Sequence, residues 1–288
     1  MTEKLYYQDP FCREFTAQVL SCDPWKDGGY AVVLDRTAFY PEGGGQNADT
    51  GTLNDVPVTD TREKEGTIFH ICSQPLSPGE SVAGRIHWEA RFDHMQQHSG
   101  EHVVSGIICR RYGCDNVGFH MGHAVVTIDF NTPIPPEDLP SIEAAANAYL
   151  WEDRAVEIQT LSGAALEAAE YRSKKYIPGE VRLVTFPGAD CCACCGTHVR
   201  TSGQVGLVKL LSCQPFREGV RIEMVCGRRA VAYCSAILDQ NLQVSHLLSA
   251  KATDTAAAVE RLQRELYALR GRTAALEEAV FQEKARSL

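Results

Sequence analysis

Two pairs of potential metal ligands stand out in this sequence, and in each pair the residues are four positions apart. His98 and His102 lie in a segment with helical periodicity, so at about 3.6 residues per turn both imidazoles share one face. Cys194 and His198 form the second pair, and Gly196 between them allows a tight loop whose ends can reach one ion. Cysteine together with three histidines suits Zn²⁺ best. We therefore predict one tetrahedral zinc site made from both pairs.

The histidine pair also satisfies the pattern H-x-x-E-H, through Glu101. In inverted zinc metalloproteases the glutamate of this pattern is the general base. Such a peptidase needs a further carboxylate ligand and an open position on the metal, whereas Cys194 and His198 would complete the tetrahedron here. A peptidase is therefore the alternative that the ligand count disfavours.

A glycine-rich segment is the second candidate for chemistry. Residues 36–46 read RTAFYPEGGGQ, with two aromatic residues and a proline before three consecutive glycines. Backbone without side chains lets another chain approach closely and offers N–H donors to an anion or a carbonyl. A flexible hairpin tip is the alternative interpretation. A Walker A loop is excluded, because no Lys-Ser or Lys-Thr follows the glycines.

The elements that must position these residues are predicted from periodicity. The first 88 residues are β-rich, and turn signals separate the short strands expected at 30–34, 51–56 and 67–71. Short strands at this spacing suggest a small barrel. Helices are then expected over 90–111 and from Pro135 to about Trp151, with strands at 123–129, 156–160, 181–186 and 205–211. This uneven alternation predicts an α+β layer.

The last part of the chain carries a heptad pattern. Alternating spacings of 3 and 4 separate Val259, Leu262, Leu266, Leu269, Thr273, Leu276 and Val280. Because the neighbouring residues are charged, a coiled-coil hairpin or dimer arm is favoured over a helix that packs on its own domain. No glycine or proline ends this helix before Leu288, which predicts a truncated chain.

Three parts are therefore expected along the chain. A β-barrel domain with the glycine-rich loop occupies residues 1–88, and a two-layer α/β domain with the zinc site occupies residues 89–234. A helical, coiled-coil-like segment follows over residues 235–288 and offers a route to a homodimer. The predicted fold class is α+β.

Composition excludes several other classes. The 288 residues are 44% hydrophobic and 23% charged, as in an ordinary globular protein of roughly two domains. No stretch reaches the roughly 20 apolar residues of a membrane span. The first residues lack the pattern of a signal peptide, so we expect a cytoplasmic protein.

Charge and cysteine content refine this picture. The net charge of −9 disfavours broad binding of polyanions, although the basic cluster Arg172, Lys174 and Lys175 can hold a phosphate backbone locally. Four of the twelve cysteines lie within residues 191–195. In a reducing compartment such a cluster points to metal ligation before disulfides. Cys194 is the ligand that the spacing selects, and the others have no assigned role.

Taken together, these motifs resemble the AlaX family, the free-standing relatives of the editing domain of alanyl-tRNA synthetase. The sequence T-x-F-Y-P-x-G-G-G-Q over 37–46, the histidine pair, and D-x₃-C-x-G-T-H-V over 190–199 occur in the family's order. GFHMG at 118–122, TID at 127–129 and GVRIE at 219–223 match secondary motifs, so the resemblance covers about residues 5–230. Cys195 departs from the family, which usually has a small residue there.

The resemblance implies a small N-terminal barrel followed by a two-layer editing domain, in agreement with the strands expected above. It implies an aminoacyl-tRNA deacylase that hydrolyses, in trans and without ATP, the ester of a wrong amino acid on tRNA(Ala). Serine is the expected amino acid, and glycine is the second candidate. No synthetase catalytic domain fits in the remaining length, so the chain is not expected to charge tRNA.

The resemblance also suggests roles for particular residues. Thr37 and Gln46 are the candidates for the catalytic pocket, where a Thr37 hydroxyl would bond the side chain of serine, a bond that alanine cannot make. The alternative for Thr37 is a threonine that satisfies only local backbone. For substrate and tRNA contacts the candidates are Gly43, Gly44, Gly45, Arg172, Lys174 and Lys175, with Arg228 and Arg229 as further options. Since four protein ligands describe a closed site, zinc is expected to organise the pocket.

Two hypotheses from other classes remain. One is a non-catalytic module that binds tRNA and zinc but has lost turnover. The other is a fragment of a longer enzyme whose missing C-terminal domain carries out phosphoester chemistry. Release of serine from Ser-tRNA(Ala) separates the first from an editing enzyme.

Overall fold

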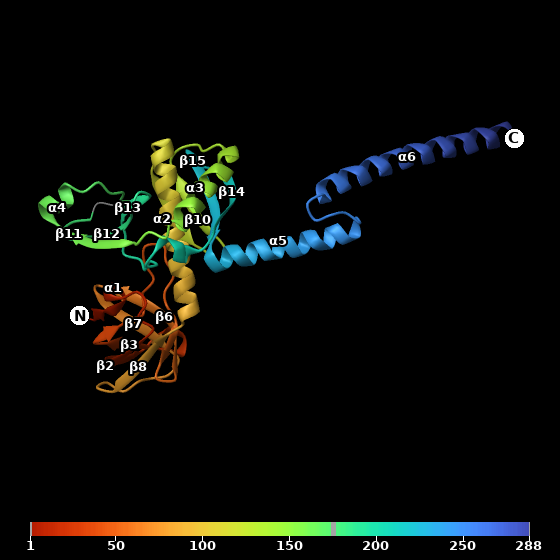
Figure 1. The fold of residues 1–288 in the computed structure, drawn as a ribbon. Helices are drawn as coiled ribbons and strands as arrows, with labels where there is room; N and C mark the ends of the chain where they lie inside the picture. Colours follow the sequence, from red (N-terminus) through yellow and green to blue (C-terminus); the bar gives the residue numbers. More distant parts are fainter. Residues whose placement is uncertain (1, 174–176, 288) are drawn as a thin grey trace. The chain divides into compact units, whose positions relative to one another are not determined.

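The computed structural model describes residues 2–173 and 177–287. The chain divides into two units, Met1–Val231 and Ala232–Leu288, and all the strands of the described residues belong to the first (Figure 1). The fold is a mixed α/β arrangement that contains a closed barrel and ends in a long helix. No helix among the described residues is both long and apolar enough to cross a bilayer. The predicted boundaries at 88/89 and 234/235 stay a prediction.

Six antiparallel strands close into the predicted barrel, in the order β2-β3-β7-β6-β5-β8. Their bounds are β2 Glu14–Pro24, β3 Tyr30–Leu34, β5 Gly51–Leu53, β6 Val56–Lys64, β7 Thr67–Cys72 and β8 Ser81–Ile86. In β8 buried and exposed residues alternate, as expected for a strand with one face toward a core. Beside the barrel, β1 (Glu3–Lys4) pairs with β4 (Arg36–Thr37), and α1 (Leu5–Gln8) follows β1.

One predicted strand in the barrel is wrong. Residues 51–56 form a hairpin, because β5 ends at Leu53 and β6 begins at Val56. The turn between them places Asn54 at a φ of 52°. Asparagine tolerates this left-handed conformation better than most residues, so Asn-Asp reverses the chain where the apolar pattern suggested continuity.

Helix α2 (Trp88–Tyr112) and α3 (Leu139–Trp151) pack with two sheets in the rest of this unit. The four-stranded sheet has the order β14-β15-β10-β9, and the three-stranded sheet has the order β11-β12-β13. The bounds are β9 Asn116–Met121, β10 Val126–Phe130, β11 Glu157–Leu161, β12 Val181–Phe186, β13 Asp190–Ala193, β14 Val208–Phe216 and β15 Gly219–Cys226. A short helix, α4 (Gly163–Glu167), follows β11.

Two predicted strands start too early. The strand expected from residue 123 begins at Val126, where it pairs with the unpredicted β9 on one side and β15 on the other. The strand expected from residue 205 begins at Val208, because Ser202–Val205 forms a 3₁₀ turn. The predicted helices 90–111 and 135–151 are confirmed, although the second starts as a 3₁₀ turn over Pro136–Asp138.

Helix α2 is more deeply enclosed than a single apolar face predicts. Residues 95–106 are all buried, because the helix contacts β9, β10, β13, β15 and α3 (Figure 1). At its N-terminal end the fully buried guanidinium of Arg91 forms an ion pair with Asp49 and donates to the carbonyl of Ala38 at 2.5 Å. These contacts anchor the N-terminal end of α2 to the segment between β4 and β5, here called the barrel loop, which contains the glycine-rich residues.

In the second unit, α6 runs from Thr255 to Arg286 as one continuous helix. It follows α5 (Gly227–Leu247), and Asn241 secures the intervening turn by donating to the carbonyl of Ala252 at 2.7 Å and by accepting from Thr255 at 2.9 Å. The apolar residues of the heptad pattern are 38–68% exposed. The predicted C-terminal helix is therefore confirmed, while the coiled coil stays a prediction.

Candidate metal centre

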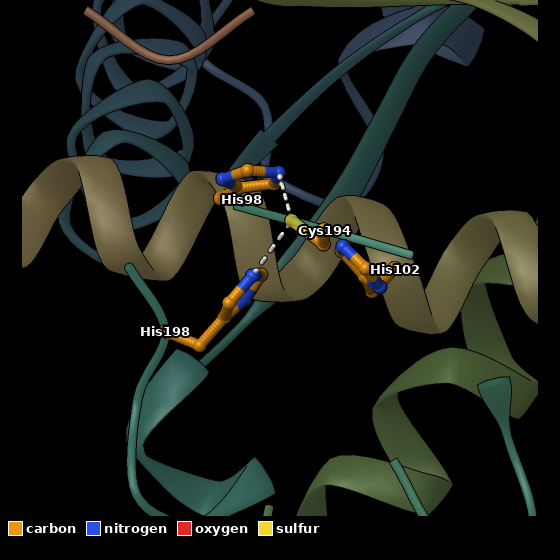
Figure 2. A group of neighbouring side chains, drawn as sticks. All are labelled: His98, His102, Cys194 and His198. Carbon is orange, nitrogen blue, oxygen red and sulfur yellow. Dashed lines mark hydrogen bonds between the residues drawn. The ribbon is translucent and has the colours of Figure 1, made fainter. Parts of the chain in front are cut away.

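The structure brings the four predicted metal ligands together. His98 and His102 lie one turn apart on α2, and Cys194 and His198 lie in the loop that follows β13 (Figure 2). One ligand atom from each lies within 4.8 Å of all the others. The Cys194 Sγ is 3.5 Å from His98 Nε2 and 3.3 Å from His198 Nε2. Ligands on a tetrahedral zinc ion are separated by about 3.5 Å, so the set fits such an ion.

Each imidazole of this cluster has a hydrogen-bond partner at Nδ1. The partners are Gln46 Oε1 for His98 at 2.9 Å, Asp190 Oδ2 for His102 at 2.9 Å, and Ser99 Oγ for His198 at 3.1 Å. An amide oxygen and a carboxylate can only accept, so His98 and His102 carry their proton on Nδ1 and leave Nε2 available. Such partners orient imidazoles for metal binding and fix their tautomer.

The electrostatics of the cluster favour the protonation states that a metal requires at Cys194 and His198. Burial opposes ionisation of Cys194, but His98 and the hydrogen bonds that the other two imidazoles make with its sulfur hold the pKa of its thiol well below the usual value. Burial lowers the pKa of His198 to about 3, which keeps it neutral. His102 differs: burial works to lower its pKa, yet bonds with Asp190 and Cys194 raise it well above normal. Metal binding at His102 must therefore displace a proton.

Gly196 is required in the loop by a close approach. A Cβ at this position would lie 2.2 Å from Cε1 of His98, a distance that no real side chain tolerates. Gly196 is not among the glycines with a positive φ. The prediction that glycine is needed here is therefore correct, but the reason is space for the His98 ring and not the tightness of the turn.

The glycine-rich loop forms a tight turn that packs against β9. Gly43 and Gln46 exchange backbone hydrogen bonds of 3.1 and 3.0 Å, and Gly44 and Gly45 between them have φ values of 60° and 85°. A Cβ on Gly45 would lie 2.5 Å from Phe119. The glycines thus allow the barrel loop to pack against β9 of the four-stranded sheet. This is the close approach of another segment that the sequence predicts. The predicted contact of the glycines with substrate or tRNA stays a prediction.

Gln46 joins the barrel loop to the metal centre. Besides accepting from His98, its Oε1 accepts the backbone N–H of Thr197 at 3.0 Å, and its Nε2 donates to the Thr197 hydroxyl at 2.8 Å. These three bonds use both ends of the side-chain amide. The geometry makes Gln46 a support for His98, and its predicted catalytic role stays a prediction.

Thr37 has its hydrogen-bond partners inside the barrel. Its fully buried hydroxyl donates to Nε2 of His70 at 2.7 Å and accepts the backbone N–H of Phe39 at 3.0 Å. The direction of the first bond follows from Nδ1 of His70, which donates to the carbonyl of Val32 at 3.0 Å. The bond to Phe39 agrees with the alternative that Thr37 satisfies local backbone. Its predicted bond to the side chain of serine stays a prediction.

The predicted basic residues are engaged with carboxylates where they are described. Arg172 holds Asp190 with two bonds of 2.6 and 2.8 Å, so it supports the partner of His102. Lys174 and Lys175 lie outside the described residues. Arg228 pairs with Glu89 and Arg229 with Asp93, each at 2.7 Å.

Glu101 does not face the metal ligands as a peptidase base would. One oxygen of this buried carboxylate accepts from the Ser105 hydroxyl at 2.7 Å and from the Asn116 amide at 2.5 Å. The side chain is thus part of a polar network between α2 and β9. This arrangement argues against the peptidase alternative.

Sequence reasoning missed Asp190 and Ser99 as partners of the ligands. Asp190 was part of a matched motif, and its position four residues before Cys194 was the available signal. Ser99 carried no signal beyond its place next to His98. All twelve cysteines are free thiols, and Cys195 is exposed beside the half-buried Cys194.

Two family profiles match parts of the chain. Residues 12–90 match "tRNA synthetases class II (A)", and residues 181–223 match "Threonyl and Alanyl tRNA synthetase second additional domain". The first match covers the barrel, and the second contains Cys194 and His198.

Full-length relatives extend this similarity. The chain is 32% identical to the alanyl-tRNA editing protein Aarsd1 of Rattus norvegicus, over 90% of this chain and 67% of that protein. It is 31% identical to the alanyl-tRNA editing protein AlaX-L of Pyrococcus horikoshii, over 100% of this chain and 74% of that protein. An alanine–tRNA ligase of Pyrococcus abyssi is 37% identical over 80% of this chain, which spans 26% of the ligase.

Proposed function

The chain belongs to the family of alanyl-tRNA editing proteins, and from this membership we propose that it hydrolyses the ester of mischarged tRNA(Ala). The proposed substrate is Ser-tRNA(Ala), with Gly-tRNA(Ala) as the second candidate, and the proposed place of action is the cytoplasm. The single observation that carries the proposal is the convergence of three imidazoles on Cys194, two of them with a hydrogen-bond acceptor at Nδ1 that leaves Nε2 available.

Zn²⁺ is the metal that we propose for this cluster, because thiolate and imidazole are ligands that it usually takes. When bound, zinc supplies a positive charge that attracts electron-rich substrate atoms. The protein's own contribution is to fix the orientation of the ligands. Gln46 holds His98 and Asp190 holds His102, so the pocket is set before the substrate arrives.

The exposure of the ligands supports one direction of approach. The three histidines are at most 3% exposed, whereas Cys194 is half-buried and Cys195 beside it is exposed. Gly44 and Gly45 of the barrel loop are exposed as well, and a Cβ on Gly44 would lie 3.1 Å from Cys195 Sγ. We therefore expect the aminoacyl ester to reach the cluster between the glycine-rich loop and Cys195.

Deacylation of purified substrates tests the proposal. The full chain, loaded with Zn²⁺, is incubated with Ser-, Gly- and Ala-tRNA(Ala), and the released amino acid is measured. We expect serine to be released faster than alanine. A protein that binds zinc and tRNA but releases no amino acid would be the non-catalytic module, and the proposed activity would be wrong.

A further inference from the structure

We propose that Tyr7 and Arg182 form the subsite for the terminal adenosine of the tRNA, a proposal that rests on the proposed function. Tyr7 lies in the short helix α1 and is 36% exposed. Its ring packs at 4.7 Å and 69° on the ring of Tyr6, which is buried. The guanidinium carbon of Arg182 lies 5.0 Å from the centroid of the Tyr7 ring. An exposed aromatic ring is thus held between a buried neighbour and a cation.

Arg182 ties this aromatic ring to the metal centre. Its Nη1 donates to the carbonyl oxygen of Cys194 at 2.7 Å and to that of Gly196 at 3.1 Å. One guanidinium therefore bridges Tyr7 and the backbone of the loop that carries two of the four ligands. Arg182 thus links Tyr7 to Cys194, the ligand with the greatest exposure, and we infer that the ester arrives on the side of Tyr7.

The substrate has a group that matches this surface. The ester of an aminoacyl-tRNA is carried by the ribose of the last nucleotide, so the adenine base lies one sugar away from the bond that breaks. Bases that are not paired bind proteins by stacking on aromatic side chains and on arginine. Lys4, whose Nζ lies 5.7 Å from the Tyr7 centroid and 2.7 Å from Glu63, adds a second cation to the ring's surroundings.

Kinetics of the full chain test the subsite. For Tyr7→Ala we expect the KM for Ser-tRNA(Ala) to rise about 5- to 150-fold, the range that corresponds to the loss of one stacked base, with little change in kcat. Tyr7→Phe should retain the wild-type KM, because stacking needs the ring and not the hydroxyl. Zinc content should stay at the wild-type level in both. Tyr267→Ala, at a strongly exposed tyrosine of α6, is the matched control.

A binding measurement separates this proposal from the proposed function. Acceptor-stem RNA hairpins ending in CCA or in CC are titrated into the protein without any aminoacyl group. The wild type should prefer the hairpin with the terminal adenosine, and Tyr7→Ala should lose that preference. If the wild type shows the preference but no deacylation, the enzyme activity fails and the subsite stands. If Tyr7→Ala behaves like the wild type in both assays, the subsite is wrong.

The exposed seam of α6 independently supports a second inference: we infer that two copies of the chain join through a parallel, two-stranded coiled coil. In heptad notation the a positions are Val259, Leu266, Thr273 and Val280, and the d positions include Leu262, Leu269 and Leu276. Predominantly β-branched residues at a with leucine at d favour parallel dimers. A polar residue at a single a position, here Thr273, specifies the register.

Charges beside the seam select the same arrangement. In a parallel dimer each g position faces the e position five residues later in the partner, which places Glu265 opposite Arg270 and Arg272 opposite Glu277. Both contacts are attractive. In an antiparallel pair each e position faces an e position of the partner and each g position faces a g position. Arg270 and Arg272 would then each face their own copy in the partner, and both contacts would be repulsive. The partner of these apolar positions is therefore the α6 helix of a second copy of the chain, oriented parallel to the first.

Sedimentation of the full chain tests the coiled coil. The wild type should be a dimer, Leu269→Lys on the seam should be a monomer, and Tyr267→Lys outside the seam should remain a dimer with the same helix content. Arg270→Glu should weaken the dimer, and the double variant Glu265→Arg/Arg270→Glu should restore it. A monomeric wild type would overturn the inference, and an Arg270→Glu dimer as stable as the wild type would overturn the parallel direction.

Discussion

Buried histidines occur in two regions of the first unit, and they differ in what their ring nitrogens contact. In the barrel, His70 uses both nitrogens for the protein: Nδ1 donates to Val32 and Nε2 accepts from Thr37. In the metal cluster, Nδ1 of each histidine has a protein partner, while Nε2 of His98 and of His198 lies within 3.5 Å of the Cys194 sulfur.

This difference separates a structural histidine from a ligand. The histidines of both regions are at most 3% exposed, so burial does not distinguish them. The distinction lies in the second nitrogen, because an imidazole whose lone pair already accepts a hydrogen bond cannot ligate a metal. The criterion can be tested in the metal cluster, where Nε2 is left for a ligand role, and at His70, where both nitrogens are occupied.

Removal of the shared sulfur should have the largest effect. Cys194→Ala deletes the atom on which the imidazoles converge, so we expect zinc content to fall to background and deacylation to be lost with it. Metal analysis and serine release are measured on the same preparation. Cys191→Ala, the same change three residues earlier, should keep both. Full activity of a zinc-free Cys194→Ala protein would show that the cluster is not the reactive site.

The barrel histidine should make stability depend on pH. Burial lowers the pKa of His70 to about 4, so between its unfolded value of about 6.5 and 4 the unfolded chain binds a proton that the folded chain does not. Stability should therefore fall as the pH falls through this window, by about 3 kcal/mol for this group. His198 titrates in the same direction, so the measured quantity is the difference in urea unfolding between the wild type and His70→Gln. Equal slopes for the two proteins would contradict the prediction.

Loss of a Nδ1 partner in the cluster should weaken metal binding without abolishing it. Asp190→Asn keeps the shape of the side chain but removes the charge that holds both His102 and Arg172. We expect zinc affinity to fall about 10- to 100-fold, measured by competition with a chelator. Asp115→Asn, in the segment between α2 and β9, changes an exposed residue in the same way and serves as the control. An unchanged affinity would mean that His102 does not need its partner.

The smallest effect is expected at Thr37. Thr37→Val leaves Nε2 of His70 without its donor inside the barrel, which should cost about 1–2 kcal/mol of unfolding free energy. Zinc content should not change. Serine release by the folded variant then decides between the two roles of Thr37: a selective loss of Ser-tRNA hydrolysis supports contact with the substrate, and wild-type release leaves only the structural role.

The metal ligands could be predicted because each pair is local in sequence. Two histidines four residues apart on a helix share a face whatever surrounds them, and a short loop keeps Cys194 near His198. Only the chemistry of the donors indicates that the two pairs meet. Their partners could not be predicted in this way: Gln46 is 52 residues from His98, and Asp190 is 88 residues from His102. Such contacts depend on how the barrel and the sheets close.

Errors in the fold have the same origin. The apolar pattern over residues 51–56 is continuous, and only the pairing of β5 with β8 and of β6 with β7 shows that the chain reverses at Asn54. The role of Thr37 in a pocket stays a prediction, but its bond to Nε2 of His70 could not be predicted, because only closure of the barrel brings the two side chains together. Periodicity reports which face of an element is apolar, and it carries no information on the neighbour that covers that face.

The position of Gln46 has a consequence for how this protein could be divided. The side chain belongs to the barrel, yet it supplies the acceptor that orients His98 and also grips Thr197 in the loop of the other two ligands. A piece cut out from residue 89 onward would keep all four ligands and lose this support. The barrel and the loop that carries Cys194 and His198 therefore have to be inherited together. Recombination that exchanged the barrel alone would separate His98 from Gln46, the residue that orients it.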